Sequence, residues 1–379
     1  MRSGLSRKDI EGRVRELVDT LFVNIPSGVG SHRKDLKLGR EEEKRVFIKG
    51  ARWAVEKGFG TEGDIEHIEE RGCIDGADPD QVSERALERG RAQLGTLGSG
   101  NHFVEVGYVA EVYDEAVARA LGLWKDQVTV FVHTGSRGMG HQVCDDYIRV
   151  MLDASKKYRI ELPDPQLCCA PVSSPEGQRY LGAMACAANF AFTNRQMITH
   201  WVRETFEQTL RMSPRDLKLD LIYDVCHNIA KIETHTVNGG KKKLCVHRKG
   251  ATRAFPPNHP EIPTDYRSIG QPVLIPGDMG RCSYVLVGTE RAMEETFGST
   301  CHGAGRVMSR HQAMKAARGR AITKELEDKG IIVRGASRGT LVEEMPDAYK
   351  DVNDVVNVVH RAGISRKVVK LIPMGVIKG

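Results

Sequence analysis

Apolar residues near the start of the chain recur with the period of a helix. They stand three or four positions apart, at Ile10, Val14, Leu17, Val18 and Leu21. This spacing predicts a helix over residues 6–22. The polar stretch 28–45 is predicted to be a loop, and 47–92 to be charged helices separated by glycine-containing turns. Residues 177–212 are predicted to form one or two long helices.

Short runs rich in β-branched residues predict strands. These runs lie at 128–132, 219–225, 273–275, 284–287 and 331–333. The predicted helices and strands do not alternate regularly, which argues against a doubly wound sheet. The chain is therefore predicted to be an α+β protein, with a mixed sheet flanked by helices in one compact domain over residues 1–379.

Composition and charge narrow the class of protein only a little. The 40% hydrophobic content supports a buried core, and the net charge of +6 would suit a polyanionic partner without requiring one. The nine cysteines are odd in number and scattered, which argues against a disulfide framework. The sequence has no signal-peptide pattern and no apolar run of membrane-spanning length. We therefore expect a cytoplasmic protein without a membrane partner.

Histidine and glycine coincide in several predicted loops at strand ends. Of the thirteen histidines, several fall in the segments 97–106, 130–142, 223–231, 246–257 and 299–306. Glycine lets the backbone approach a ligand, and imidazole can act as a metal ligand, a base or a nucleophile. A single such segment would usually hold a structural histidine, but their number together predicts a functional site.

The first two segments could handle a nucleotide or a phosphate. Asn101 and Glu105 are four residues apart and share a face, so they could read a purine edge, or they are a turn residue and a solvated carboxylate. Residues 130–142 predict a strand, a glycine-rich turn and a helix that begins at His141. Backbone amides at that helix start, together with Arg137, would suit phosphate, although no Walker A sequence is present.

Three histidines could converge on a metal ion. They are His102, His133 and His227, and Cys226 is not counted because it would point to the opposite face of an extended strand. Three neutral imidazoles hold a hard dication poorly without a carboxylate or thiolate. Neither an HExxH motif nor paired CxxC spacing occurs, so the metal evidence from the residues alone is weak.

The segment STCHGAGR is the most informative of the five. It places His302 beside a Gly-Ala-Gly run and Arg306, surroundings that would stabilise phosphoryl charge during attack by the imidazole. The alternative is a glycine-rich turn with an incidental histidine. The segment HRKGATRAF could be a clamp for an RNA backbone or an ordinary basic loop.

Together these segments resemble the RtcB family of RNA-splicing ligases. The resemblance runs from about Asp9 to Gly379 and is carried by LGSGNHFVEV, HTGSRGMGHQ, RQMITHWVRE, HRKGATRAFPP, ETFGSTCHGAGR and the terminal IKG. It implies a GTP- and Mn²⁺-dependent ligase that joins an RNA 3′-phosphate or 2′,3′-cyclic phosphate to a 5′-hydroxyl, as in tRNA splicing or RNA repair. A histidine would attack the α-phosphate of GTP and then pass GMP to the RNA 3′-phosphate. The 5′-hydroxyl of the second strand would finally displace GMP and join the strands.

The resemblance also implies roles for individual residues. The guanylylated histidine would be His302, and the manganese ligands would be His102, His133 and His227. The residues that contact RNA phosphate would be Arg137 and Arg306. The implied nucleotide-binding positions are Asn101, His102, Phe103, Val104, Glu105, His227, Asn228, Pro276, Gly277, Asp278, Met279, Ser283, His302, Gly303, Ala304, Gly305, Tyr349 and Lys378.

The resemblance departs from the family at the front of the chain. Family members carry an N-terminal block with an Asp-x-x-Cys element that supplies anionic metal ligands, and this chain is expected to lack it. The isolated chain would then be inactive or nearly so, and its partners would include, besides RNA, a separate N-terminal fragment or an activating protein. Two alternatives stay open: a catalytically impaired RNA- or nucleotide-binding remnant, and a metal-dependent phosphohydrolase acting on RNA ends.

Overall fold

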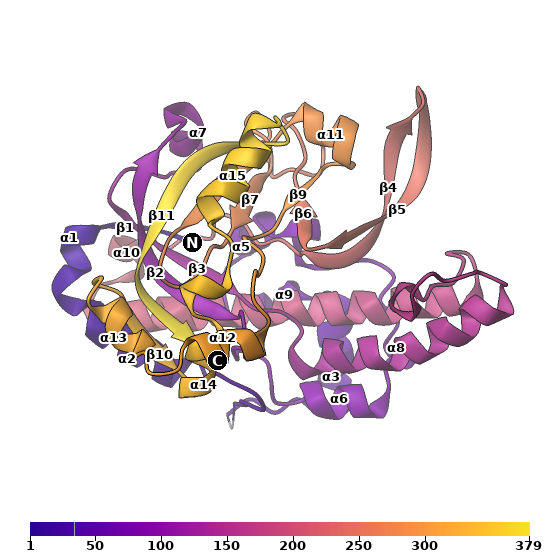
Figure 1. The fold of residues 1–379 in the computed structure, drawn as a ribbon, viewed down its shortest axis with the longest axis horizontal. Helices are drawn as coiled ribbons and strands as arrows, with labels where there is room; N and C mark the ends of the chain where they lie inside the picture. Colours follow the sequence, from indigo (N-terminus) through magenta and orange to yellow (C-terminus); the bar gives the residue numbers. More distant parts are fainter. Residues whose placement is uncertain (34) are drawn as a thin grey trace.

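A mixed, mostly antiparallel sheet forms the centre of the protein. The computed structural model describes residues 1–33 and 35–379. It contains a seven-stranded sheet in the order β1-β3-β2-β11-β8-β7, with β10 beside β11 (Figure 1). The bounds are β1 Arg2–Ser6, β2 Phe103–Val112, β3 Gln127–His133, β7 Pro272–Ile275, β8 Ser283–Gly288, β10 Ile332–Gly335 and β11 Ser365–Lys378. Only the β10–β11 pair within this sheet is parallel, so the α+β prediction is confirmed.

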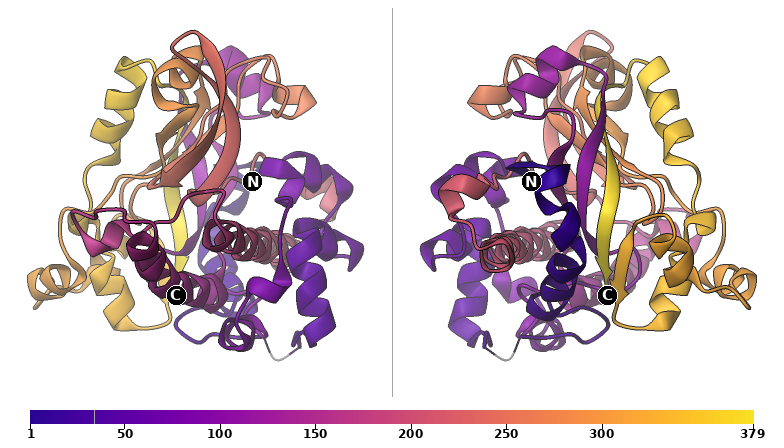
Figure 2. Two further views of the ribbon diagram at one scale, coloured as in Figure 1. Left: turned by 90° about the vertical axis from the view of Figure 1, so that its right-hand side faces the viewer. Right: turned by 90° about the vertical axis from the view of Figure 1, so that its left-hand side faces the viewer.

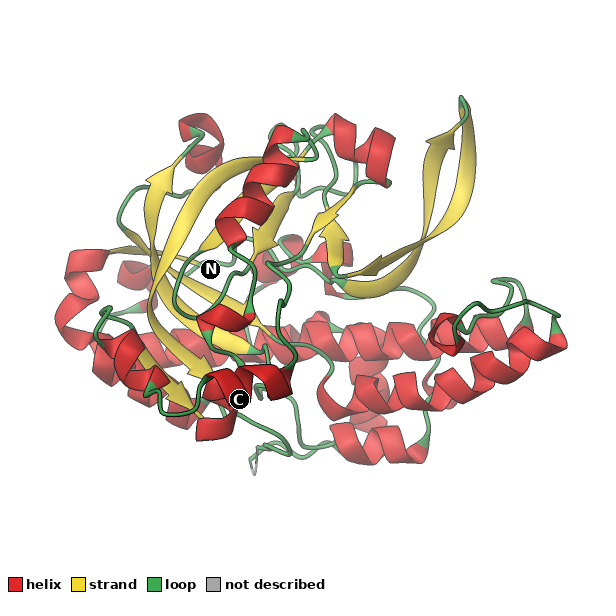
Figure 3. Cartoon of the chain, in the orientation of Figure 1, coloured by secondary structure: helices red, strands yellow, loops and turns green. Residues whose placement is uncertain are grey.

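Two two-stranded ribbons complete the strands of the described chain (Figure 3). The first is the hairpin of β4 Asn228–Val237 and β5 Gly240–Lys249, and the second pairs β6 Ala251–Arg253 with β9 Ser299–Cys301. The hairpin projects from the rest of the molecule on the side of α8 and α9 (Figure 1).

Helices surround the sheet. Their bounds are α1 Arg7–Ile10, α2 Val14–Asn24, α3 Arg40–Lys49, α4 Ala51–Glu56, α5 Glu62–Glu66, α6 Glu84–Gly90, α7 Glu115–Ala120, α8 Arg137–Lys157, α9 Pro175–Leu210, α10 Pro214–Leu217, α11 Glu290–Thr296, α12 Arg310–Ala316, α13 Ile322–Glu327, α14 Arg338–Glu343 and α15 Val352–Arg361. Helix α9 runs uninterrupted for 36 residues. The Ser174 side chain caps its first turn and Pro175 occupies its first position, which is favourable because the proline lacks an N–H.

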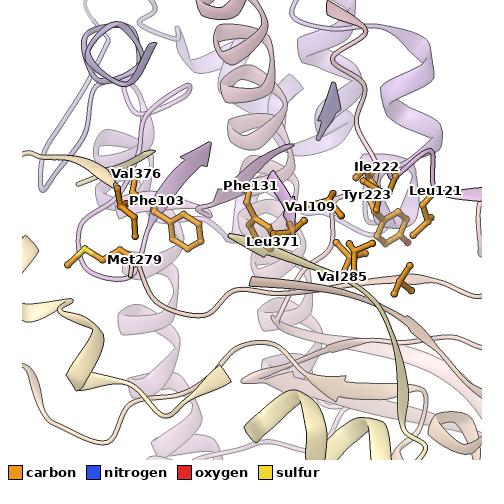
Figure 4. Packing of buried hydrophobic residues seen from close by; sticks show 14 of the residues in the cluster. Phe103, Val109, Leu121, Phe131, Ile222, Tyr223, Met279, Val285, Leu371 and Val376 are labelled. Carbon is orange, nitrogen blue, oxygen red and sulfur yellow. The ribbon is translucent and has the colours of Figure 1, made fainter. Parts of the chain in front are cut away.

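The two faces of the sheet are buried against different parts of the chain. Alternate residues of β2 separate the two cores: Phe103 faces one, and Val104 faces the other with side chains of α2 and α9. Figure 2 shows N-terminal helices on one side of the sheet and C-terminal helices on the other. Figure 4 shows the core on the side of Phe103, where Phe131, Leu371 and Val376 pack together. The cavities described below open from this side.

Several predicted boundaries differ from the structure. The helix predicted at 6–22 is divided into α1, a 3₁₀ turn and α2, and the loop predicted at 28–45 already contains the start of α3. Residues 219–225 do not form a strand, because the segment meets its neighbours only at single bridges of Asp220 and Asp224. The predicted helix at 177–212 is one helix, and the strands at 128–132, 273–275, 284–287 and 331–333 are confirmed to within a few residues.

Candidate active site

Four histidines that are far apart in sequence meet at the ends of short strands. The ring centroids of His102 and His133 are 5.7 Å apart, and those of His133 and His227 are 5.1 Å apart. The ring of His302 stacks on His227 at 4.6 Å with an angle of 14° between the planes. We call these four residues the histidine cluster. The structure therefore brings together the histidine predicted as nucleophile and the three predicted as metal ligands.

Strand pairing explains why the cluster forms. The register of β2 and β3 places Phe103 opposite His133, so His102, which precedes Phe103, lies beside the end of β3. His302 directly follows β9, whose Cys301 pairs with Ala251. A Cβ built on Gly250 would lie 3.7 Å from Cε1 of His302, so the chain that leads out of the hairpin passes close to this ring.

The histidine cluster is electrically neutral. Burial lowers the pKa of His102 to about 3 and that of His227 to about 2, and it lowers the pKa of His133 well below its usual range. The nearby charge of Arg195 acts in the same direction on all three rings. Burial also lowers the pKa of His302, while a hydrogen bond with the Gly250 backbone opposes this shift. Each ring therefore keeps a nitrogen lone pair at neutral pH.

These neutral imidazoles fit a metal ion only in part. The Nε2 atoms of His133 and His227 are 3.4 Å apart, which matches the separation of about 3.4 Å expected for two nitrogens bound to one ion at about 2.1 Å with tetrahedral angles. The ring of His102 instead has its Nδ1 3.3 Å from the Thr134 hydroxyl. Among the described residues, no set of three or more His, Cys, Asp or Glu side chains already surrounds one point. The pair His133–His227 is thus the part of the predicted metal site that the geometry favours.

A cavity of about 280 Å³ opens beside the cluster. Many of the predicted nucleotide-binding residues line it, and these are Asn101, Phe103, Glu105, Pro276, Gly277, Asp278, Met279, His302, Gly303, Ala304, Gly305, Tyr349 and Lys378. The cavity wall also contains His133, Arg306, Arg310, Glu344 and Val376. We call this space the nucleotide cavity. Residues from six separate stretches of sequence meet in it, and the imidazole predicted to react, that of His302, forms part of its wall.

Opposite charges are buried in the wall of the nucleotide cavity. Burial and the charge of Asp278 raise the pKa of Glu105 to about 8, although Lys378 and a hydrogen bond from Ser283 oppose the shift. The ammonium group of Lys378 lies 3.7 Å from a carboxylate oxygen of Glu344. Burial lowers the pKa of Lys378, and Glu344 raises it. Glu105 therefore lacks a full ion-pair partner, and in the free protein its carboxyl group is mostly protonated at neutral pH.

Other predicted nucleotide-binding residues lie outside the wall of this cavity. Val104 is 1% exposed and its side chain packs in the core with α2 and α9, so the predicted contact with a nucleotide could come only from its backbone. The reason is the pleat of β2, which turns alternate side chains to opposite faces. Ser283 is buried behind Glu105, whereas Asn228 is exposed at the first position of β4. His102 and His227 belong to the histidine cluster.

The two arginines predicted to contact RNA phosphate are both engaged by protein acceptors. Arg137 donates to the Gly28 carbonyl and to the hydroxyls of Ser31 and Thr96. It begins α8, so the glycine-rich stretch predicted as a turn before His141 is helical. Arg306 lines the nucleotide cavity and directs Nη1 to Glu344 at 3.0 Å. Of the two, Arg306 is the one placed beside the nucleophile loop.

The basic segment HRKGATRAF contains two exposed and two buried basic side chains. Arg248 and Arg253 are 1% and 0% exposed, so the interpretation of all four cations as an RNA clamp is wrong for these two. Arg248 forms two hydrogen bonds with the Glu233 carboxylate, of 2.6 and 2.9 Å. Arg253 joins a group of charges, which we call the ion network: the buried Glu69, Lys231 and Arg253 with the exposed Glu70 and Glu261. His247 and Lys249 remain exposed.

Three residues of the site, Arg195, Asp224 and Glu344, were missed by sequence reasoning. Nε of Arg195 donates to both oxygens of Asp224, at 2.7 and 2.9 Å, and Nη1 donates to the Thr134 carbonyl. Both residues line a second, smaller cavity with His133, His227 and His302. The signal that could have found Arg195 is an arginine on the buried face of α9. Glu344 was missed as well, because its segment contains neither histidine nor glycine.

The geometry is that of a protein that binds and transfers a phosphoryl group: a neutral nucleophile beside a cavity, with buried cations and glycine-rich loops around it. Comparison with known proteins places it in a family. The sequence model described as tRNA-splicing ligase RtcB matches residues 1–379, and the chain belongs to the RtcB family. The chain is 58% identical to the tRNA-splicing ligase RtcB of Archaeoglobus fulgidus over 379 residues, which are 100% of the chain and 78% of the relative.

Two further relatives are similar over the same range. The chain is 54% identical to the tRNA-splicing ligase RtcB of Methanococcus maripaludis and 54% identical to that of Thermococcus kodakarensis. Each match covers 100% of the chain, together with 79% of the first relative and 78% of the second.

These matches bear on the expected truncation. The expectation that a metal-ligand block is lacking is not supported, because the matches extend over residues 1–379. A separate N-terminal fragment as partner is likewise not supported, and the alternative of an impaired remnant is not favoured. The expected inactivity of the chain had rested on that missing block. In the described part of the chain, no helix is both long and apolar enough to span a membrane.

Proposed function

We propose that the chain is a GTP-dependent RNA ligase that joins a 3′-phosphate, or a 2′,3′-cyclic phosphate after its opening, to a 5′-hydroxyl. The observation that carries this proposal is the neutral imidazole of His302, which lies between the nucleotide cavity and the rest of the histidine cluster. Membership of the RtcB family supports the same activity. The substrates would be tRNA halves or other broken RNA ends.

His302 is the proposed nucleophile. One ring nitrogen would share its proton with the Gly250 backbone, which leaves the lone pair of the other free to attack the α-phosphorus of GTP. A P–N bond forms, the P–O bond to the β-phosphate breaks, and its electron pair leaves with pyrophosphate. An oxygen of the RNA 3′-phosphate then attacks the same phosphorus, and the electron pair of the P–N bond returns to His302. Attack by the 5′-hydroxyl on the 3′-phosphorus finally releases GMP and the hydroxyl proton.

The nucleotide cavity would bind the guanine base. Guanine presents N–H donors that a carboxylate can accept, so Glu105, whose pKa is about 8, would lose its proton when the base binds. The Gly303–Gly305 stretch beside the nucleophile would let backbone amides approach the phosphates. Of the arginines, Arg306 would contact phosphate from the cavity wall and Arg137 from the start of α8.

A divalent ion, which we propose to be Mn²⁺, would be held by His133 and His227, with His102 as third ligand. The neutral state of these imidazoles supports this assignment, since ligands must be unprotonated. When bound, such an ion would neutralise phosphate charge. The nine free thiols suit a reducing, cytoplasmic setting. None of these residue assignments depends on an activating protein.

The proposal is tested by following the guanylyl group. The chain is incubated with Mn²⁺ and GTP labelled at the α-phosphate, denatured, and assayed for covalent label. We expect the parent to retain label that is released by acid, as a P–N bond requires, and His302→Ala to retain none. His311→Ala is the matched control, because His311 is an exposed histidine on α12. Label retained by His302→Ala would contradict the assignment of the nucleophile.

A further inference from the structure

The β4–β5 hairpin has two chemically different faces. Its register pairs Lys249 with Asn228, Lys243 with Thr234 and Lys241 with Thr236. Because side chains of a strand alternate between faces, the odd-numbered residues of β5 lie on one side with their partners on β4. We call this side the outer face. It contains Lys241, Lys243, Cys245, His247 and Lys249 from β5, and Asn228, Ala230, Ile232, Thr234 and Thr236 from β4.

The opposite, inner face fixes the hairpin to the body. Arg248 donates to Glu233 within the hairpin, and also to the Ser299 hydroxyl and the Phe297 carbonyl beyond it. His235 packs edge-on against the Phe297 ring, with centroids 5.3 Å apart. Arg248 and His235 are almost completely buried. The hairpin is therefore anchored to the body of the protein, and the inner cation Arg248 is engaged in these structural contacts.

The outer face, by contrast, carries lysine side chains that form no ion pair with the described residues. Lys241, Lys243 and Lys249 are exposed, and none takes part in an ion pair between the described residues. His247 is exposed between them, and Ile232 is 43% exposed. Positions two apart on a strand are separated by about 6.7 Å, so the row from Lys241 to Lys249 is about 27 Å long.

This row ends at the proposed nucleophile. Strand β5 stops at Lys249, and the backbone of the next residue, Gly250, forms a hydrogen bond with the His302 ring. The next strand, β6, pairs with β9, the strand that precedes His302. The positive charge of Lys249 contributes to the lowered pKa of His302, after burial. Figures 1 and 2 show the other end of the hairpin projecting away from the helices.

We propose that the outer face of the β4–β5 hairpin binds the sugar–phosphate backbone of the RNA strand whose end reacts at His302. A row of exposed lysines suits a phosphate backbone, and His247 and Ile232 offer surfaces on which bases can stack or pack. The narrow ribbon favours a single strand over a duplex. This inference rests on the proposed ligase function and adds to it the path of the RNA outside the nucleotide cavity.

The test removes the two lysines farthest from the nucleophile. The double variant Lys241→Gln/Lys243→Gln is compared with the parent for binding of a labelled single-stranded RNA with a 3′-phosphate, over a range of salt concentrations. Loss of two phosphate contacts should reduce the slope of log K against log salt by about 1.4 and weaken binding by roughly tenfold or more at 0.1 M salt. Self-guanylylation with GTP should be unchanged, since it uses only the nucleotide cavity and the histidine cluster.

Two controls make the result specific to this face. Lys242→Gln removes the same charge from the same strand but on the inner side, and Lys324→Gln/Lys329→Gln removes two exposed charges from and beside α13. Both should bind RNA within about twofold of the parent. Parental affinity and salt slope in the Lys241→Gln/Lys243→Gln variant would overturn the inference. A parent that does not guanylylate itself would instead contradict the proposed function, so the two failures are distinguishable.

Discussion

The histidine cluster and the ion network are two buried polar groups with opposite chemistry. In the ion network, Lys231 donates to Glu69 at 2.9 Å, and Arg253 donates to Gln271 at 2.8 Å and to Glu70 at 3.2 Å. In the histidine cluster, the rings are neutral and no carboxylate is shared among them. Burial acts on both, but only the ion network holds compensating charges.

This difference shows which polar groups hold the fold and which are free to react. Burial by itself would raise the pKa of Glu69, yet Lys231 and Arg253 lower it to about 2. The same desolvation, with no carboxylate partner, lowers the pKa of the imidazoles and leaves their lone pairs free. In this protein the paired charges hold the fold together, whereas the imidazoles without a charged partner keep the lone pair that a nucleophile or metal ligand needs.

The largest effect is expected from breaking the ion network. Arg253→Met should lower the free energy of unfolding by about 3–5 kcal/mol, because it removes one of the two cations that lie beside the buried carboxylate of Glu69. His302→Ala should change it by less than about 1 kcal/mol while abolishing guanylylation. Urea denaturation of both variants measures this contrast, with the exposed Arg119→Met on α7 as control. If Arg253→Met and His302→Ala lowered the free energy of unfolding equally, the ion network would not be more important for stability than the histidine cluster.

A pH titration sharpens the same comparison. The pKa of Glu69 is about 2 in the folded protein and about 4.5 when unperturbed, so its ionised form stabilises the fold above pH 4.5. That contribution, about 3 kcal/mol, should be lost as pH falls from 4.5 towards 2. The difference in unfolding free energy between parent and Glu69→Gln should therefore narrow over this range. A constant difference from pH 6 to pH 3 would contradict the charged role of Glu69.

The smallest expected effect concerns base selection in the nucleotide cavity. Glu105→Gln should reduce the preference for GTP over ATP in self-guanylylation by roughly tenfold, because an amide cannot accept both guanine donors. In the parent, whose Glu105 pKa is about 8, guanine nucleotide affinity should rise as pH increases towards 8 and then level off.

The control for this prediction is Glu111→Gln, on the same strand but exposed. It should keep both the preference and the pH dependence of the parent. Identical GTP and ATP use by Glu105→Gln and the parent would show that another group selects the base.

Much of the site could be predicted from local sequence, and the errors have a common cause. The nucleotide cavity contains Asn101, Glu105 and the residues around His302, as the histidine–glycine segments indicated. Sequence reasoning failed where a residue's direction depended on its partner strand. Val104 turns into the core, and Arg248 and Arg253 turn inward to bind carboxylates. The hairpin that exposes Lys241 and Lys243 was not predicted, since its lysine run lacks the alternation typical of a strand.

The sequence by itself determined the α+β class, the long helix α9, the segments that supply the site and, through its motifs, the family. These features depend on local periodicity and on residue types that need no partner to be recognised. Only the tertiary structure decided which polar groups stay unpaired. Whether a buried imidazole, arginine or carboxylate meets an opposite charge depends on strands brought together from distant parts of the chain, and that pairing separates the reactive His302 from the structural Arg253.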